Sequence, residues 1–269
     1  MSAVRLAATV ILARPRFEVY LARRSGRSKF APEAFVFPGG TIDQTDASQA
    51  MQSRTLGLED ARLAAEFRAA VSGQLRSSEP AIAPADARAL LVAALRELFE
   101  EAGVLFARTA AGDPVDAAML EERGAAADRS RLRDGSLTFA GFLSANDWYA
   151  DAGALTLFSH WITPPSEPRR YNTHFFFAAA PRDQAALADA DEMHDGIWIA
   201  PSEALERYRA GTMHLVYPTI KHLERLARFE ALESLEAAFD FARSKPIVTV
   251  MPADAGDDFA IPPALEGAW

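Results

Sequence analysis

The sequence of 269 residues contains no cysteine. It therefore has no disulfide framework, no thiolate nucleophile and no cysteine-based zinc site. No apolar run approaches the roughly 18 residues that a membrane-spanning helix needs, and the N-terminal residues lead into a strand pattern without the apolar core of a secretory signal. These absences predict a cytoplasmic protein with no membrane partner.

Several catalytic and binding devices are also missing. The sequence has no Gly-x-Ser-x-Gly element for a serine nucleophile, no phosphate-binding loop and no dinucleotide-binding glycine pattern. Its five histidines show no pair at helical metal spacing, so we expect structural or surface roles for them. The formal net charge of −9 disfavours nucleic acid as a partner.

One acidic stretch carries the strongest chemical signal. Glu97, Glu100 and Glu101 stand at i, i+3 and i+4, so they share one face of a helix. Like charges at this spacing repel one another, whereas a cation among them would be held by all three. Carboxylate oxygens favour Mg²⁺ or Mn²⁺ over zinc. A solvated acidic face is the alternative interpretation.

The same helix has an apolar stripe about 130° around its axis from the glutamates. Its members are Leu91, Ala94, Leu95, Leu98 and Ala102. Arg96 lies four residues before Glu100, within pairing distance. Gly103 is placed to end the helix in a left-handed cap. We therefore expect one helix face to dock on a core and the other to look into a cleft.

Upstream, residues 35–40 (Phe-Val-Phe-Pro-Gly-Gly) indicate a short buried strand entering a Gly-Gly turn. Together with residues 96–104 (Arg-Glu-Leu-Phe-Glu-Glu-Ala-Gly-Val) this resembles the signature of the Nudix hydrolases. That signature runs Gly, five residues, Glu, seven residues, then Arg-Glu-apolar-x-Glu-Glu-x-Gly-apolar. Counted from Gly40, Asp46 takes the place of the first glutamate, and 49 residues, 47 to 95, stand where the family has seven.

The long insertion resembles the coenzyme A diphosphatase branch of the family, in particular its motif-19 type. The signature that precedes the box in this branch is matched in spacing from Tyr20 to Gly40. Lys29 takes its arginine position, and Glu33 departs from its glycine position. Residues 161–176 and 192–205 resemble later segments of the same branch.

The resemblance implies a Nudix-type α/β/α sandwich with a mixed sheet and a helical insertion, over residues 4–230. The insertion covers about 47–85, a second variable segment covers about 108–150, and residues 231–269 form an extension of unknown role. Alternating and β-branched patterns predict strands at 5–12, 17–23, 154–163, 171–180 and 197–199. Helices are expected from about 86 to 102, near 115–131, and at 201–209 and 219–229, with Leu63, Phe67 and Val71 on a further helix closed by Ser72-Gly73.

For the chemistry, the resemblance implies metal-assisted hydrolysis of a pyrophosphate bond. The metal ligands would be Glu97, Glu100, Glu101 and the Gly40 carbonyl. Catalytic candidates are Arg96, Glu100, Glu101 and Glu192, and the base would be a helix glutamate or Glu192. Substrate phosphates would be bound by Arg24, Lys29, Arg169 and Arg170, beside Gly39.

A local basic cluster supports a phosphate-rich small ligand, although a solvated hairpin would look the same. It comprises Arg14, Arg16, Arg23, Arg24, Arg27 and Lys29. Coenzyme A or an acyl-coenzyme A, giving 3′,5′-ADP and (acyl-)4′-phosphopantetheine, is the leading substrate. ADP-ribose, NADH or a dinucleotide is the alternative, and a Nudix-fold ligand-binding module without turnover is the second. A homodimer is left open.

Overall fold

The computed structural model describes residues 4–26, 31–67, 82–188, 193–230, 234–244, 247–255 and 258–269. Its main sheet has the strand order β10-β2-β1-β9-β8-β11. These strands are β1 (Arg5–Arg14), β2 (Glu18–Arg24), β8 (Thr156–Ile162), β9 (Tyr171–Ala179), β10 (Met193–Ile199) and β11 (Thr249–Val250). Strand β1 runs parallel to β9 and antiparallel to β2, so the predicted mixed sheet is confirmed.

Two short strands open a gap along one edge of β1. Strand β2 pairs with β1 only at Ala13 and Arg14. Further along the same strand, β4 (Gly39–Thr41) pairs with residues 7–9 of β1, while β3 (Phe35–Val36) pairs with β2. Between β3 and β4 the chain passes through Phe37 and Pro38, from the side of β2 to the side of β1. Strands β1 and β2 are therefore separated beside the Gly-Gly segment.

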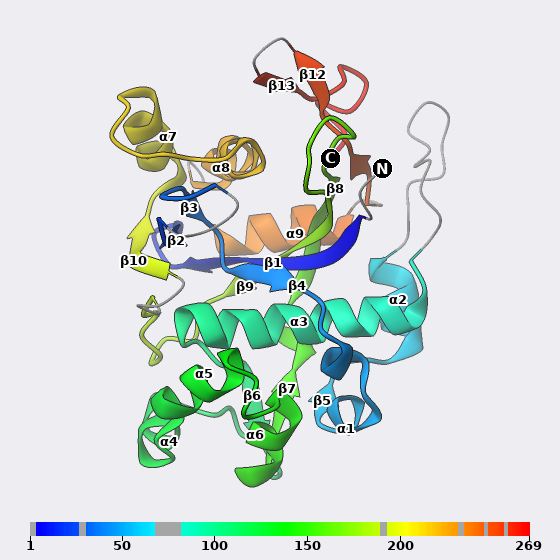
Figure 1. Ribbon diagram of the computed structural model, residues 1–269, viewed down its shortest axis with the longest axis vertical. Coiled ribbons are helices and arrows are strands. Elements are labelled where there is room, and N and C mark those ends of the chain that lie inside the picture. The colour runs from blue at the N-terminus through cyan, green and yellow to red at the C-terminus, as the bar shows by residue number, and fades with distance from the viewer. Residues whose placement is uncertain are drawn as a thin grey trace.

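Both faces of the sheet are buried. Alternate residues of β1 point to opposite sides: Val10 packs in one core cluster and Ile11 in the other. Helix α3 (Pro84–Ala102) covers the first face, and α7 (Pro201–Arg209), α8 (Tyr217–Glu230) and α9 (Leu235–Ser244) lie on the second (Figure 1). This is the α/β/α sandwich that the sequence predicts.

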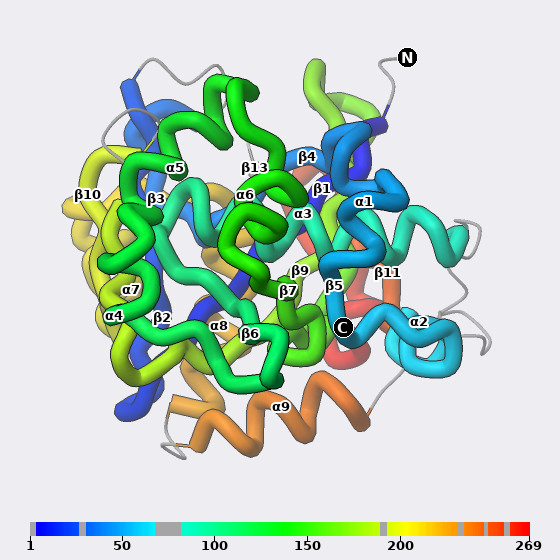
Figure 2. The backbone as a smooth tube through the Cα atoms, turned by 90° about the horizontal axis from the view of Figure 1, so that it is seen from below, coloured from blue at the N-terminus to red at the C-terminus, as the bar shows by residue number. Residues whose placement is uncertain are grey.

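A further layer lies beneath α3, on the side away from the sheet (Figures 1 and 2). It contains η1 (Gln44–Ala47), α1 (Gln49–Gln52), α4 (Ala117–Glu122), α5 (Ala125–Arg133), α6 (Phe139–Ala145), η3 (Ala152–Ala154) and a small sheet of β5 (Thr55–Leu56), β7 (Trp148–Asp151) and β6 (Ala107–Thr109). The rings of Phe99 and Phe142 stack across this layer at 5.0 Å. Every residue of α3 from Ala89 to Leu95 is consequently buried, so the expectation of one docked face and one cleft face is incomplete.

The second variable segment is more ordered than the sequence suggests. A single helix near 115–131 is wrong: α4 and α5 are separate helices that meet at Gly124, which is left-handed. Beyond that helix the sequence predicts only loop in this segment, which is also wrong, because Thr138 caps α6 through its side chain and Phe142 anchors that helix in the core. These helices are too short for the hydrophobic periodicity of the sequence to reveal them.

Other predicted elements are confirmed with small shifts. Helix α7 has the predicted bounds, and α8 begins two residues early at Tyr217. Strand β10 begins at Met193 because it follows β2 past a bulge. In the insertion, α2 spans Asp60–Glu66, and Val71, Ser72 and Gly73 lie outside the described residues.

Helix α3 ends as predicted. Gly103 is left-handed, with φ 70° and ψ 10°, and its N–H donates to the Phe99 carbonyl over 2.9 Å.

The final residues are part of the same body. Helix α9 packs in the second core cluster, β11 adds to the main sheet beside β8, and β12 (Ala253–Ala255) pairs with β13 (Asp258–Ala260). The ring of Trp269 is buried.

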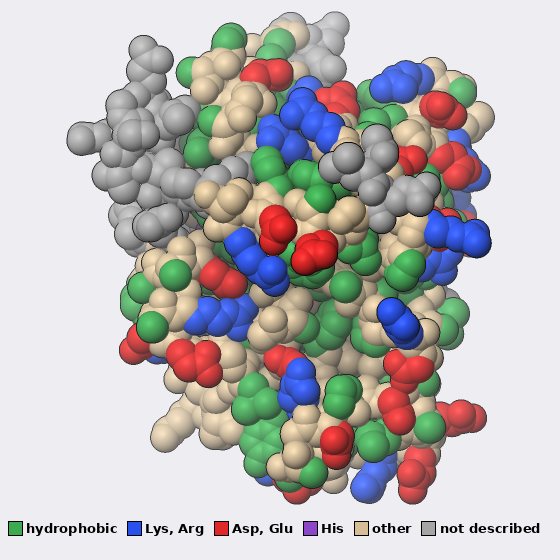
Figure 3. Space-filling model, turned by 180° about the vertical axis from the view of Figure 1, so that it is seen from behind, with side chains coloured by type: hydrophobic (Ala, Val, Ile, Leu, Met, Phe, Trp, Pro, Cys, Tyr) green, Lys and Arg blue, Asp and Glu red, His purple; other side chains and the backbone are tan. Residues whose placement is uncertain are grey.

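The surface opposite to the view of Figure 1 intersperses acidic and basic side chains (Figure 3). In the described ranges, no helix has the length and apolarity to cross a membrane.

Candidate active site

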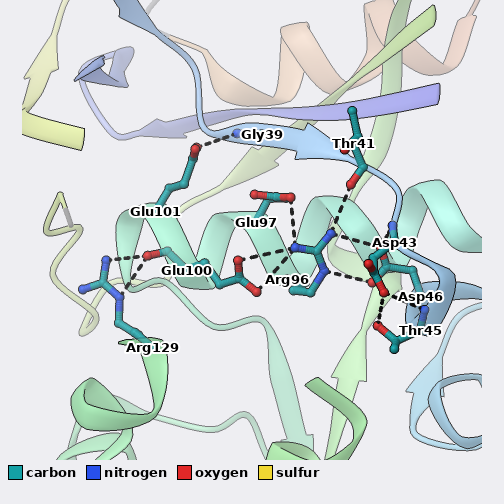
Figure 4. Close-up of polar contacts among 10 residues, drawn as sticks. All are labelled: Gly39, Thr41, Asp43, Thr45, Asp46, Arg96, Glu97, Glu100, Glu101 and Arg129. Atoms are coloured by element: carbon teal, nitrogen blue, oxygen red, sulfur yellow. Dashed lines mark hydrogen bonds and ion pairs between the residues drawn. The ribbon is translucent and has the colours of Figure 1, made fainter. Parts of the chain in front are cut away.

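Two of the predicted glutamates face a cavity at the gap in the sheet. Glu97 and Glu101 of α3 line a cavity of about 370 Å³ together with Gly39 and Gly40 of β4. Glu101 is buried, and its carboxylate accepts a hydrogen bond of 2.8 Å from the Gly39 N–H (Figure 4). The helix therefore presents two carboxylates against the backbone of the Gly-Gly strand.

Both glycines approach a neighbour closely, which is strand backbone at Gly39 and a flexible side chain at Gly40. A methyl group at Gly39 would overlap the carbonyl oxygen of Ala8 on the neighbouring strand. At Gly40 it would overlap the carboxylate of Glu97. Only hydrogen leaves room for β4 to pair with β1 and for Glu97 to lie against it.

Arg96 organises the acidic side chains (Figure 4). Its guanidinium donates to both carboxylate oxygens of Asp46 over 2.9 and 3.0 Å, and to the Thr41 carbonyl over 3.2 Å. It also donates to Glu97 over 2.9 Å and contacts Glu100 at 3.4 Å. Burial lowers the pKa of Arg96, but the hydrogen bond to Asp46 and the surrounding carboxylates raise it above its ordinary value, so the group stays charged.

Asp46 shows how the split signature is reassembled. It is 1% exposed and lies in η1, where its side chain also accepts from the Asp43 N–H. The insertion begins directly after Asp46. Helix α3 follows it and carries Arg96, which pairs with Asp46. The sequence identified the acidic position of Asp46 but not this partnership.

Glu100 is turned away from the cavity, toward Arg96 (Figure 4). Burial raises its pKa from 4.5 to about 7; the charge of Arg96 opposes this rise and the charge of Glu97 adds to it. The expectation that Glu97, Glu100 and Glu101 all surround one cation is therefore wrong for Glu100. Throughout the described ranges, no three His, Asp or Glu side chains are gathered as a ready metal cluster.

The donor set nevertheless fits a hard divalent cation. Two carboxylates share one cavity wall, and the backbone of Gly40 lies in contact with one of them. All these donors are oxygens, which Mg²⁺ and Mn²⁺ prefer. The groups that could hold a metal are thus Glu97, Glu101 and the Gly40 carbonyl.

Of the arginines predicted to bind substrate, one lines the cavity and the others do not. Arg24 lines the cavity, whereas neither Arg169 nor Arg170 does. Arg170 donates instead to the Thr163 carbonyl over 3.0 Å, and Arg169 is exposed. Lys29, predicted for phosphate binding, lies outside the described residues, as does the base candidate Glu192.

Other members of the basic cluster are engaged elsewhere. Arg14 pairs with Glu18 at 2.7 Å. Arg23 pairs with Asp195 and, at 3.0 Å, with Glu33, the residue in the branch's glycine position. The negative charge of Glu33 is thereby matched by Arg23.

Sequence reasoning missed the rest of the lining, which carries hydroxyl, aromatic and apolar groups. These residues are Ala7, Thr9, Val36, Phe37, Thr41, Thr163, Tyr171, Thr173, Phe175, Val216, Pro218 and Thr219. Strand alternation held a usable signal, because Tyr171, Thr173 and Phe175 occupy successive odd positions of β9.

Comparisons with known proteins show similarity to one family. The family model described as NUDT19 Nudix domain matches residues 1–226. The chain is 30% identical over 239 residues to the acyl-coenzyme A diphosphatase NUDT19 of Homo sapiens, covering 81% of this chain and 63% of that protein. It is 29% identical over 232 residues to putative nudix hydrolase 7 of Caenorhabditis elegans, covering 84% and 62%. The chain thus spans less than two thirds of these relatives.

A solved structure supports the same fold. The crystal structure of a NUDIX hydrolase from Alicyclobacillus acidocaldarius superposes with a TM-score of 0.69 at 27% identity. The match covers 92% of this chain and 99% of that one.

The raised pKa of Glu100 predicts a pH-dependent stability in metal-free protein. A raised carboxyl pKa stabilises the fold fully below pH 4.5, and this contribution is lost as pH rises through about 7. We expect Glu100→Gln to gain about 2 to 3 kcal/mol relative to the native chain between pH 5 and pH 8. Urea unfolding in EDTA at several pH values measures this difference.

The matched control is Glu203→Gln on the surface of α7, where the side chain is 48% exposed. We expect this exposed substitution to leave the unfolding free energy close to that of the native chain. A Glu100→Gln gain that does not grow between pH 5 and pH 8 would contradict the raised pKa of the buried Glu100 carboxyl.

Proposed function

Because this chain belongs to the Nudix family described as the NUDT19 Nudix domain, we propose that it hydrolyses a diphosphate-linked nucleoside derivative, with coenzyme A or an acyl-coenzyme A as substrate. The observation that carries this proposal is the pair Glu97 and Glu101 against Gly39–Gly40, in one cavity with Arg24. The human relative is an acyl-coenzyme A diphosphatase, which supports the coenzyme A substrate class.

The chain's own groups are arranged for a metal-dependent reaction. Glu97, Glu101 and the Gly40 carbonyl would hold Mg²⁺ or Mn²⁺, which when bound supplies charge neutralisation of the diphosphate and activation of a water. The Gly39 N–H fixes one oxygen of Glu101, and Arg96 fixes one oxygen of Glu97. Both carboxylates are therefore oriented before substrate arrives, which lowers the reorganisation needed in the transition state.

Arg24 would supply positive charge to the phosphates from the other strand that borders the gap. It is the last residue of β2, and its N–H donates to the Ala34 carbonyl over 3.0 Å. The ligand would then lie between a carboxylate wall on α3 and a cation on β2.

The experiment that tests the function is a substrate screen. With Mg²⁺, purified protein should hydrolyse coenzyme A or an acyl-coenzyme A to 3′,5′-ADP and a 4′-phosphopantetheine. ADP-ribose and NADH should be poorer substrates. Glu101→Gln should lower kcat at least about a hundredfold because it removes a metal-binding carboxylate.

The control for this variant is Glu206→Gln, an exposed glutamate of α7, which should keep the native rate. A Glu101→Gln enzyme with native turnover at saturating Mg²⁺ would sink the site assignment. A native enzyme that cleaves none of the four compounds would overturn the proposed function.

A second prediction separates coenzyme A from the alternative substrates. Coenzyme A carries a 3′-phosphate that ADP-ribose lacks, so its recognition should need an additional cation. A charge-assisted hydrogen bond is worth roughly 1.5 to 3 kcal/mol, or about ten- to a hundredfold in affinity. Arg24→Ala should therefore raise KM for coenzyme A by that factor and change KM for ADP-ribose less.

Arg23→Ala provides the neighbouring control, because Arg23 pairs with Glu33 and Asp195 and does not line the cavity. Its KM for coenzyme A should stay near the native value. Equal KM increases for both substrates in Arg24→Ala would favour the broader class of nucleoside diphosphate derivatives over coenzyme A.

A further inference from the structure

One section of the cavity wall is formed by the start of α8 and by aromatic side chains of the sheet. Val216, Pro218 and Thr219 come from α8 and the residue before it, Phe37 from the segment before β4, and Phe175 from β9. None of these residues belongs to the acidic helix. They define the shape of the cavity rather than its charge.

Behind this wall stands His222, one turn into α8. It is fully buried and does not itself line the cavity. Its ring stacks on Phe175 with the centroids 4.1 Å apart, and meets Phe37 edge-on at 6.3 Å. Its Nδ1 contacts the Pro218 carbonyl at 2.6 Å. One side chain thus touches three residues that face the ligand space.

The polar contacts of His222 fix its tautomer. A carbonyl only accepts, so Nδ1 carries a proton toward Pro218. In the neutral form of the ring, Nε2 is then the acceptor for the Ser159 hydroxyl, 2.6 Å away. Ser159 is 2% exposed. The serine–histidine pair is therefore closed off from substrate, and its contacts hold a ring in place instead of activating a nucleophile.

The segment after α9 covers His222 on a further side. Trp269 is buried, with its ring 5.2 Å from His222 and 4.8 Å from Trp161. The guanidinium of Arg225 lies 4.5 Å over the Trp269 ring and donates to the Glu266 carbonyl over 3.2 Å. This cover lies beyond residues 1–226, which the family model matches.

The same segment supports the start of α8 at a second point. Phe259 of β13 packs on Tyr217 with the rings 5.8 Å apart, and Tyr217 meets Trp161 at 6.3 Å. In Figure 1 the β12–β13 hairpin lies near α8 and the loop between β8 and β9. The segment after α9 therefore supports this part of the cavity wall from behind, although none of its described residues lines the cavity.

We propose that His222, held by Ser159 and covered by Trp269, is a positioning residue that sets substrate affinity by fixing Phe37, Phe175 and Pro218. The inference rests on the proposed function for its substrate. It assigns the last segment of the chain a role in shaping the cavity, separate from the carboxylates that would hold the metal.

The test is His222→Phe, which keeps a ring of similar size and removes both polar contacts. We expect KM for coenzyme A to rise about three- to tenfold, the usual worth of one or two hydrogen bonds. Turnover and the Mg²⁺ concentration for half-maximal rate should stay within twofold of native. Trp269→Ala should raise KM in the same way, and Trp269→Phe should restore most of it.

The matched control is His174→Phe. His174 is also buried and also lies beside Phe175 in β9, but it stacks on His160 and does not line the cavity. Its KM should remain native. Equal KM increases in both histidine variants, or a loss of kcat in His222→Phe with unchanged KM, would overturn the proposal.

Hydrogen exchange of residues 215–220 separates this inference from the proposed function, because it needs no substrate. Exchange there should be faster in His222→Phe and Trp269→Ala than in His174→Phe. Equal exchange in all three would contradict the inference even if coenzyme A is cleaved. Faster exchange in the first two would support it even if the native enzyme cleaves another diphosphate.

Discussion

The hydrogen bonding of the largely buried Arg96 guanidinium is the interaction on which the site depends. It joins the acidic residue before the insertion, Asp46, to the helix after it, and its bond to the Thr41 carbonyl also holds the end of β4. An arginine this deep is costly unless its hydrogen bonds are satisfied, and a bidentate carboxylate with further acceptors satisfies them. Removing Arg96 would leave the buried carboxylate of Asp46 without its cation, so the distance between α3 and the Gly-Gly strand is strongly fixed. The orientation of Glu97 follows from the same contact.

This constraint explains how a 49-residue separation inside the signature leaves its geometry intact. Lengthening a loop adds little closure entropy, about 0.6 kcal/mol per doubling. The insertion must only leave after Asp46 and return at Pro84, and some of its residues help form the layer beneath α3. That layer buries the side of α3 away from the sheet, and burial raises the pKa of Glu100. None of the described residues of the insertion lines the cavity.

Sequence patterns were sufficient for the long periodic elements and for the acidic helix, because these depend on local spacing. Spacing shows that Glu97, Glu100 and Glu101 share a face and that Arg96 can pair with Glu100, but it cannot show that this pair turns Glu100 away from the cavity. That outcome depends on Asp46, a tertiary partner. The short helix with Phe142 and the burial of Trp269 were missed for the same reason: neither has a local period, and both are stabilised by contacts distant in sequence. Strand alternation, applied to β9, could have identified Thr173 and Phe175 as lining residues.

The central claim is that Glu97 and Glu101, set against Gly40, hold a divalent cation. The most direct measurement is a Mn²⁺ titration of metal-free protein by electron paramagnetic resonance, without substrate. The native chain should bind Mn²⁺, and the Glu97→Gln/Glu101→Gln double variant should bind at least about tenfold more weakly, because two anionic donors are lost. Glu203→Gln/Glu206→Gln, on exposed α7, should titrate like the native chain. Equal Mn²⁺ affinity in the native chain and the Glu97/Glu101 double variant would contradict the account.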